Sequence, residues 1–146
     1  MGDKMKTEKD VLDSILKTTQ MGQVGIRAVT PKASNIMLQK ALHDQLDEYN
    51  SIECEAQKIA RQRGWELKDL APMAKPMSEM YTRFNLSYGN ADSKIAAMMI
   101  QGNTRGIIKG LKNKHHCKNC DEEILNIAQK LLHCEDQNIK QMQGYL

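Results

Sequence analysis

Two histidines and two cysteines lie close together in the last third of the chain, in the order His115-His116-Cys117-x-x-Cys120. Two thiolates separated by two residues, with imidazole nitrogens beside them, are typical ligands of a tetrahedral zinc site. His133 is too distant to complete such a site, because the helix expected between it and Cys120 spans about 20 Å. The string is open to three interpretations: a metal site closed by the loop alone or with a second chain, a redox-active thiol pair, or two reduced loop thiols without function. The sequence favours the third.

The composition of the 146-residue chain is that of a soluble helical protein. Hydrophobic residues make up 40 % and aromatic residues only 4 %, with ten methionines and three prolines. The strand-like alternation of β-branched residues is absent, which favours an all-α fold. The net charge of +3 is small, and the only basic run, 109–118, lacks aromatic residues on which bases could stack. We therefore expect no nucleic-acid binding and interpret this run as a solvated loop.

No export signal or membrane-spanning segment is visible in the sequence. The first residues, MGDKMKTEKD, are charged, and no apolar run approaches 18 residues. We therefore expect no membrane association and a cytoplasmic location. In that compartment the four cysteines (Cys54, Cys117, Cys120 and Cys134) are expected to be reduced.

Four segments place apolar residues at the spacing of amphipathic helices, at about 9–29, 34–63, 91–112 and 121–143. Thr30-Pro31 ends the first helix, Gly64 ends the second, and Asp121 begins the fourth. Within the crossover 64–90, apolar residues recur at i, i+3, i+4, i+7 and i+11 from Met77 to Tyr88. This spacing predicts a short amphipathic helix in the crossover.

The lengths of the connections predict how the helices are arranged. Short turns join the first helix to the second and the third to the fourth, so each pair is expected to be antiparallel. The long crossover can return along the bundle, which makes the second and third helices parallel. This up-down-down-up order is the ferritin-like topology of a four-helix bundle. The sequence therefore predicts one all-α domain over residues 1–146.

A short internal repeat supports two related hairpins, because Gln-x4-Gly-Ile occurs at 20–26 and again at 101–107. A hairpin repeated across a long crossover resembles the ferritin-like superfamily, including the rubrerythrins. The string ARQRGW at 60–65 is similar to the end of the second helix in spore-coat proteins of the Coat F type from Firmicutes. The string SKIAAMMIQGNTRGI at 93–107 resembles small ferritin-like proteins of clostridia. The resemblance covers about residues 9–143.

The resemblance implies a di-iron centre, which uses one Glu from each of two helices and Glu-x-x-His from each of the other two. The first and third helices have acids only near their beginnings (Asp10, Asp13 and Asp92). The second helix has Tyr49 and Ile52 where Glu and His would be expected. The fourth helix retains Glu135, but Asn138 replaces the histidine. We therefore expect the di-iron chemistry of the family to be lost.

Polar residues remain at the level of the lost centre, and we call them the central polar cluster: Gln23, Tyr49, Thr104, Glu135 and Asn138. A carboxyl group on an apolar helix face must be hydrogen-bonded or have its pKa raised so that it stays neutral. The favoured interpretation is a hydrogen-bonded core network that fixes how the helices align. A small-ligand pocket and a single metal ion are the alternatives.

Three glycines recur every fourth residue in the third helix, at Gly102, Gly106 and Gly110. Glycine costs about 1 kcal/mol relative to alanine inside a helix, so another segment is expected to pack closely there. Close packing within one chain is the favoured explanation of this stripe. The alternative is the interface of a homodimer, which the methionines of the crossover also suggest.

The function expected from these features is a non-catalytic structural or protein-interaction role, without a cofactor and with a protein partner. The Coat F resemblance implies a link to sporulation and a spore-associated location. The alternative is a metal-binding or redox protein that uses either a central site at Glu135 and Tyr49 or the loop His115–Cys120.

Overall fold

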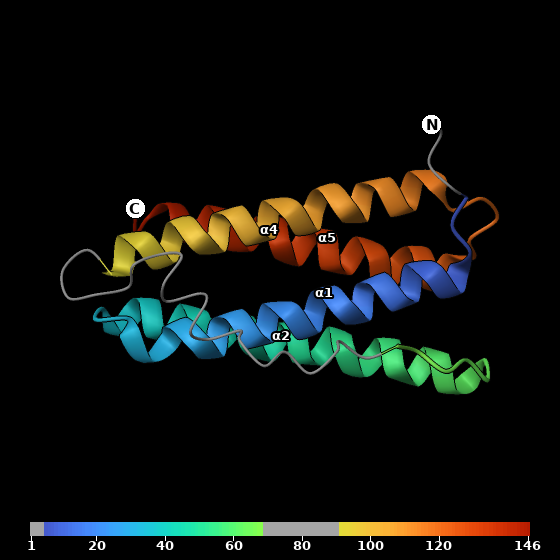
Figure 1. Ribbon diagram of the computed structural model, residues 1–146, viewed down its shortest axis with the longest axis horizontal. Coiled ribbons are helices and arrows are strands. Elements are labelled where there is room, and N and C mark those ends of the chain that lie inside the picture. The colour runs from blue at the N-terminus through green and yellow to red at the C-terminus, as the bar shows by residue number, and fades with distance from the viewer. Residues whose placement is uncertain (1–4, 69–90) are drawn as a thin grey trace.

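The computed structural model describes residues 5–68 and 91–146, which form a bundle of four long helices (Figure 1). The helices are α1 (Glu8–Val29), α2 (Ile36–Gln62), α4 (Ala91–His116) and α5 (Glu122–Gln143), and a 3-10 turn, η1 (Thr30–Lys32), follows α1. The described residues contain one isolated β-bridge and no strand. The prediction of an all-α four-helix bundle is therefore confirmed for this part of the chain. The predicted crossover helix lies in 69–90, outside the described residues.

Local signals set most of the helix ends. Thr7 caps α1 by accepting a hydrogen bond from the Asp10 backbone, and the Asp10 carboxylate accepts from the Thr7 backbone in return. Asn35 caps α2 and Asp121 caps α5 in the same way, through side-chain oxygens. The predicted end of the third helix is wrong, because α4 continues past 112 to His116. Most of the basic run is therefore the last turns of a helix and not a loop.

The ARQRGW string forms the turn that ends α2. Gly64 adopts a left-handed conformation with φ of 69°, which glycine reaches without a steric penalty. The Trp65 N–H then donates to the Ala60 carbonyl at 2.8 Å, and the Gly64 N–H donates to the Arg61 carbonyl at 3.2 Å. These two bonds make a Schellman motif, which satisfies carbonyls at the helix end. Arg63 and Trp65 are thereby held in fixed positions.

The helices pack as two hairpins, α1 with α2 and α4 with α5 (Figure 1). At one end, the backbone N–H groups of Ser34 and Asn35 donate to the Asp92 carboxylate at 2.7 and 3.0 Å. These bonds place the beginning of α2 beside the beginning of α4. Both helices therefore begin at the same end of the bundle.

Arg63 joins three helix ends at the opposite end of the bundle. Its guanidinium lies 2.7 Å from Asp121, 2.9 Å from Glu123 and 3.5 Å from Glu8. The beginning of α1, the end of α2 and the beginning of α5 therefore lie together. The Asp121 N–H also donates to the Glu8 carboxylate at 2.9 Å. The two hairpins are thus linked by hydrogen bonds at both ends.

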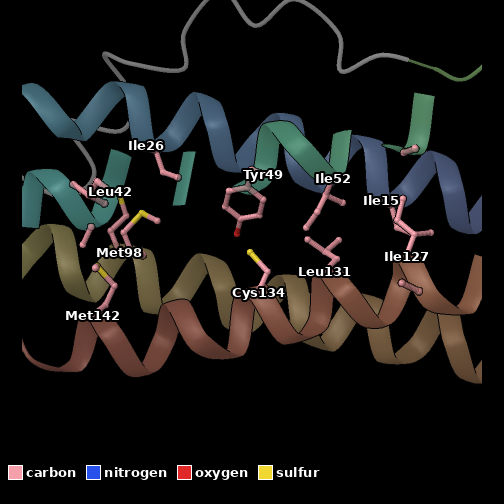
Figure 2. Packing of buried hydrophobic residues seen from close by; sticks show 14 of the residues in the cluster. Ile15, Ile26, Leu42, Tyr49, Ile52, Met98, Ile127, Leu131, Cys134 and Met142 are labelled. Atoms are coloured by element: carbon pink, nitrogen blue, oxygen red, sulfur yellow. The ribbon is translucent and has the colours of Figure 1, made fainter. Parts of the chain in front are cut away.

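The core consists of apolar layers on either side of a polar middle. In Figure 2, Ile15, Ile52, Ile127 and Leu131 lie on one side of Tyr49, and Ile26, Leu42, Met98 and Met142 lie on the other. All of these side chains are buried. The middle layer is thereby separated from water along the axis of the bundle. No helix in the described residues is long and apolar enough to cross a membrane.

Candidate functional site

A chain of buried hydrogen bonds connects three helices in the middle of the bundle. The Tyr49 hydroxyl on α2 donates to Oδ1 of Asn103 on α4 at 2.7 Å. The same hydroxyl lies 3.1 Å from Oε2 of Glu135 on α5. Asn103 in turn donates from Nδ2 to the Met99 carbonyl at 2.7 Å, which fixes the orientation of its amide. No more than 2 % of Tyr49, Asn103 or Glu135 is exposed.

The Tyr49 hydroxyl contacts two oxygen atoms, one on Asn103 and one on Glu135. A phenol has one proton, and Oδ1 of Asn103 can only accept. The hydroxyl can therefore donate fully to only one of the two oxygens at a time. Burial raises the pKa of Glu135 to about 8, and the hydrogen bond with Tyr49 opposes this only in part. Glu135 is therefore mainly neutral at pH 7. Burial, followed by the proximity of Glu135, also raises the pKa of Tyr49.

Two glycines make room for these side chains. A Cβ atom at Gly106 would overlap the Glu135 carboxyl group, with its Cδ only 2.6 Å away. A Cβ atom at Gly22 would lie 2.7 Å from Cε2 of the Tyr49 ring. The carboxyl group and the ring therefore rest directly against the backbones of α4 and α1. Oε1 of Glu135 has no hydrogen-bond partner among the described residues. A neutral carboxyl tolerates this better than a carboxylate would.

The two glutamines of the first helix bind a different residue. Gln20 and Gln23 donate to the two carboxylate oxygens of Glu53 on α2, at 2.8 and 2.9 Å. Gln23 is buried as predicted, but it does not join the chain formed by Tyr49 and Glu135. It belongs instead to a link within the first hairpin. Glu53 was not among the predicted site residues, because it lies beside the apolar stripe of its helix.

Asn138 lies one turn along α5 from Glu135 and is also buried. Its Nδ2 atom donates to the sulfur of Cys134 at 3.7 Å. Burial raises the pKa of the Cys134 thiol, and the nearby Glu48 carboxylate raises it further. Cys134 is therefore a neutral, enclosed thiol and not a nucleophile.

Thr104 does not lie in the cluster where it was expected. Its side chain is exposed, and its hydroxyl donates to the Ile100 carbonyl of the same helix at 2.7 Å. The neighbouring residue Asn103 takes the inward position. Ile100 and Ile107 are large and apolar, yet both are only half-buried.

The inward face of α4 instead contains glycines. Leu132 lies against Gly110, and Glu135 lies against Gly106, whereas Gly102 has nothing within 4 Å of a Cβ position. The predicted close packing is therefore confirmed at two of the three glycines. The segment that approaches them is α5.

The loop predicted as a metal or thiol site contains a disulfide between Cys117 and Cys120, with Cα atoms 5.9 Å apart. The expectation of reduced thiols is wrong for this pair, while Cys54 and Cys134 are free. The rings of His115 and His116 meet edge to face at 5.0 Å. Within 5–68 and 91–146, no three His, Cys, Asp or Glu residues are placed to hold one metal ion. Disulfide sulfurs also lack the negative charge of the thiolates that bind zinc.

The buried polar residues do not match the needs of a di-iron centre. Seven buried side chains are polar in the described part of the chain: Thr19, Gln23, Gln45, Asn103, Asn113, Glu135 and Asn138. Glu135 is the only acid among them, and its pKa near 8 keeps it mainly neutral. Di-iron centres need several ionised carboxylates to balance the charge of two cations. Tyr49, Asn103 and Glu135 are instead suited to form fixed hydrogen bonds with one another.

No protein-family model, curated protein or solved structure matches this chain at a significant level.

Proposed function

We propose that this chain is a non-catalytic bundle protein of the ferritin-like type that has a structural or protein-interaction role. The arrangement of helix ends supports the ferritin-like assignment. The parallel pair, α2 and α4, is separated in the sequence by the long segment 63–90, and each hairpin is closed by a short turn. One long crossover between two antiparallel hairpins is the arrangement that defines this topology.

The observation that carries the proposal is the buried hydrogen-bonded chain Glu135–Tyr49–Asn103. Its three residues come from α5, α2 and α4, so the chain connects the two hairpins across the core. A buried polar group costs free energy unless its partners are in place, which penalises any other alignment of the helices. The role that we assign to this layer is to fix helix alignment in a scaffold. In ferritin-like bundles that bind metal, the ligands lie in the core between the helices, which is also the level of this hydrogen-bonded chain.

An exposed apolar ridge on α4 supports an interaction role. Ile108 and Leu111 are 51 % and 53 % exposed, and Ile107 beside them is half-buried. We propose that this ridge contacts a second copy of the chain. Light scattering of the wild-type protein and of the double variant Ile108→Ser/Leu111→Ser tests this directly. A dimer that becomes a monomer on substitution is the expected result, and a wild-type monomer would contradict it.

Element analysis of the purified full-length protein separates the scaffold from its alternative, a metal protein. We expect helical protein without stoichiometric iron, manganese or zinc after dialysis. Metal that persists in a stoichiometric amount would overturn the scaffold proposal. Two variants would then locate it, because Glu135→Gln removes the central carboxyl and Cys117→Ser/Cys120→Ser removes the loop sulfurs.

A further inference from the structure

The disulfide lies at the junction of α4 and α5. Cys117 follows the last residue of α4, and Cys120 precedes Asp121, the cap of α5. Asn119 between them adopts a left-handed conformation with φ of 63°, which closes the turn. Both cysteines are only half-buried, whereas Lys118 and Asn119 are exposed. A small thiol can therefore approach this turn from solvent.

This bond contributes little to holding the fold together. The stabilisation from a disulfide grows with the length of the loop it closes, and this one spans only two intervening residues. The same end of the bundle is already held by Arg63, which pairs with Asp121, and by Glu8, which accepts from the Asp121 N–H. A structural role for the disulfide is therefore largely redundant.

The surroundings of the pair favour reaction with thiols. Lys112, Lys114 and Lys118 lie within a few residues of Cys117, whereas the acids Asp121, Glu122 and Glu123 follow Cys120, so the basic side of the pair is that of Cys117. All three lysine side chains are exposed. Positive charge stabilises a thiolate, both on an approaching reagent and on the cysteine that leaves. Reactive disulfides are typically exposed in this way, whereas structural ones are buried.

We propose that Cys117 and Cys120 form a redox-active pair that exchanges electrons with external dithiols. A thiolate of the external dithiol attacks one sulfur of the pair, so that the Cys117–Cys120 bond breaks and a mixed disulfide forms. The second external thiolate then attacks the mixed disulfide and releases the protein sulfur. The external dithiol is oxidised to a disulfide, and the protein gains two electrons and two protons. The inference is independent of the proposed scaffold role.

The redox state of the pair is connected to the segment before α1. The Lys6 N–H donates to the His116 carbonyl at 2.9 Å, and Lys6 forms a parallel bridge with Cys117. Opening the disulfide frees the backbone of Cys117 from the constraint imposed by Cys120. We therefore expect the protection of the Lys6 amide against hydrogen exchange to fall on reduction, while helix interiors such as that around Leu42 keep theirs.

The test uses the full-length protein with Cys54→Ser, which removes the exposed free thiol. Samples are equilibrated with mixtures of dithiothreitol and its oxidised form, quenched in acid and labelled with a maleimide under denaturing conditions. We expect Cys117 and Cys120 to gain labels together, in one two-electron transition. Cys134 serves as an internal reference that is labelled throughout. Cys117→Ser and Cys120→Ser should each abolish the transition and form a mixed disulfide when incubated with oxidised glutathione.

Three outcomes would overturn the proposal. The pair would be inert if both cysteines remain thiols in the fully oxidised mixture. It would be a structural bond if dithiothreitol reduces it no faster than the protein unfolds. It would be a metal site if the purified protein contains zinc and loses it only when both cysteines are replaced. None of these results depends on Glu135, so the scaffold proposal can fail or hold separately.

Discussion

The carboxyl group of Glu135 lies against the α4 backbone at Gly106, in a space that no other residue would leave open. The same carboxyl group contacts the Tyr49 hydroxyl at 3.1 Å. These two contacts position the carboxyl group between α4 and α2. The glycine in the sequence TRGI is therefore explained by a side chain on the neighbouring helix.

Gly106→Ala is expected to destabilise the protein. The added methyl group must push the Glu135 carboxyl away from Tyr49, and overpacking of a filled core typically costs about 1–3 kcal/mol. The better helix propensity of alanine offsets about 1 kcal/mol of this. We therefore expect a net loss of free energy of unfolding, measured by urea denaturation followed by circular dichroism.

Gly102→Ala is the matched control for that variant. Gly102 lies one turn earlier on the same helix, and a Cβ there has nothing within 4 Å. Only the helix propensity changes, so the variant should gain about 0.5–1 kcal/mol. If both variants gain stability, the close approach of Glu135 to α4 is wrong.

The stability of the protein should depend on the proton of Glu135. The carboxyl group has an ordinary pKa of 4.5 and a pKa of about 8 in the fold. Between these pH values the folded state keeps a proton that the unfolded state has lost. The free energy of unfolding should therefore decrease as the pH rises from about 4.5 to 8 and level off above that. The contribution of this one group is roughly 5 kcal/mol at most.

Glu135→Gln isolates this contribution, because the amide has nearly the same shape and does not titrate. We expect the difference in free energy of unfolding between wild type and variant to change with pH over that window. Other groups with shifted pKa values, such as Asp10 and Asp121, are present in both proteins and titrate at lower pH. A difference that is constant from pH 4.5 to 9 would contradict a buried neutral carboxyl group.

Much of the fold could be predicted because helix signals are local. The cap at Asp121, the left-handed glycine at 64 and the apolar stripes of α1, α2 and α5 all follow from short-range rules. Tyr49, Glu135 and Asn138 were placed correctly in the core, because each lies on a stripe of apolar residues. A polar residue on such a stripe is readily identified, because its neighbours on the same helix face are apolar.

The residues of α4 that face the core could not be predicted in the same way. Its inward residues include Asn103, Gly106 and Gly110, which have no hydrophobic signal of their own. In the same half of the helix, the large apolar residues Ile108 and Leu111 are exposed, so apolar side chains do not mark its inward face. The small residues face inward because α5 packs closely against them. The sequence of α4 alone does not indicate this close approach. Likewise, the pairing of Cys117 with Cys120 depends on a turn that a two-residue spacing permits but does not require.

Tyr49→Phe should weaken the link between the hairpins without changing the shape of the core. Loss of the hydroxyl leaves Oδ1 of Asn103 and Oε2 of Glu135 without their partner, and each unsatisfied buried group costs about 1–3 kcal/mol. The pKa of Glu135 should also rise further, because the bond from Tyr49 lowers it. Urea denaturation of Tyr49→Phe, Glu135→Gln and the double variant measures the coupling. Strictly additive losses would show that the two side chains do not interact.

Arg63→Gln should destabilise the bundle by more than the loss of an ordinary surface ion pair. Arg63 is 22 % exposed and faces the three acids Glu8, Asp121 and Glu123, which repel one another when it is removed. Its guanidinium also lies 5.1 Å from the centre of the Trp65 ring. We expect a loss of about 1–2 kcal/mol in urea denaturation at low salt, and a smaller loss at high salt.

The pair between Lys40 and Asp44 provides the control for Arg63. It is a simple helical pair in which both side chains are more than half exposed, at 67 % and 57 %. Lys40→Gln should leave the free energy of unfolding almost unchanged. The contrast matters because Arg63 connects three helix ends, whereas Lys40 pairs with Asp44 of its own helix. Equal losses for the two variants would mean that the three-helix junction adds nothing, and that the hairpins are held together by the core alone.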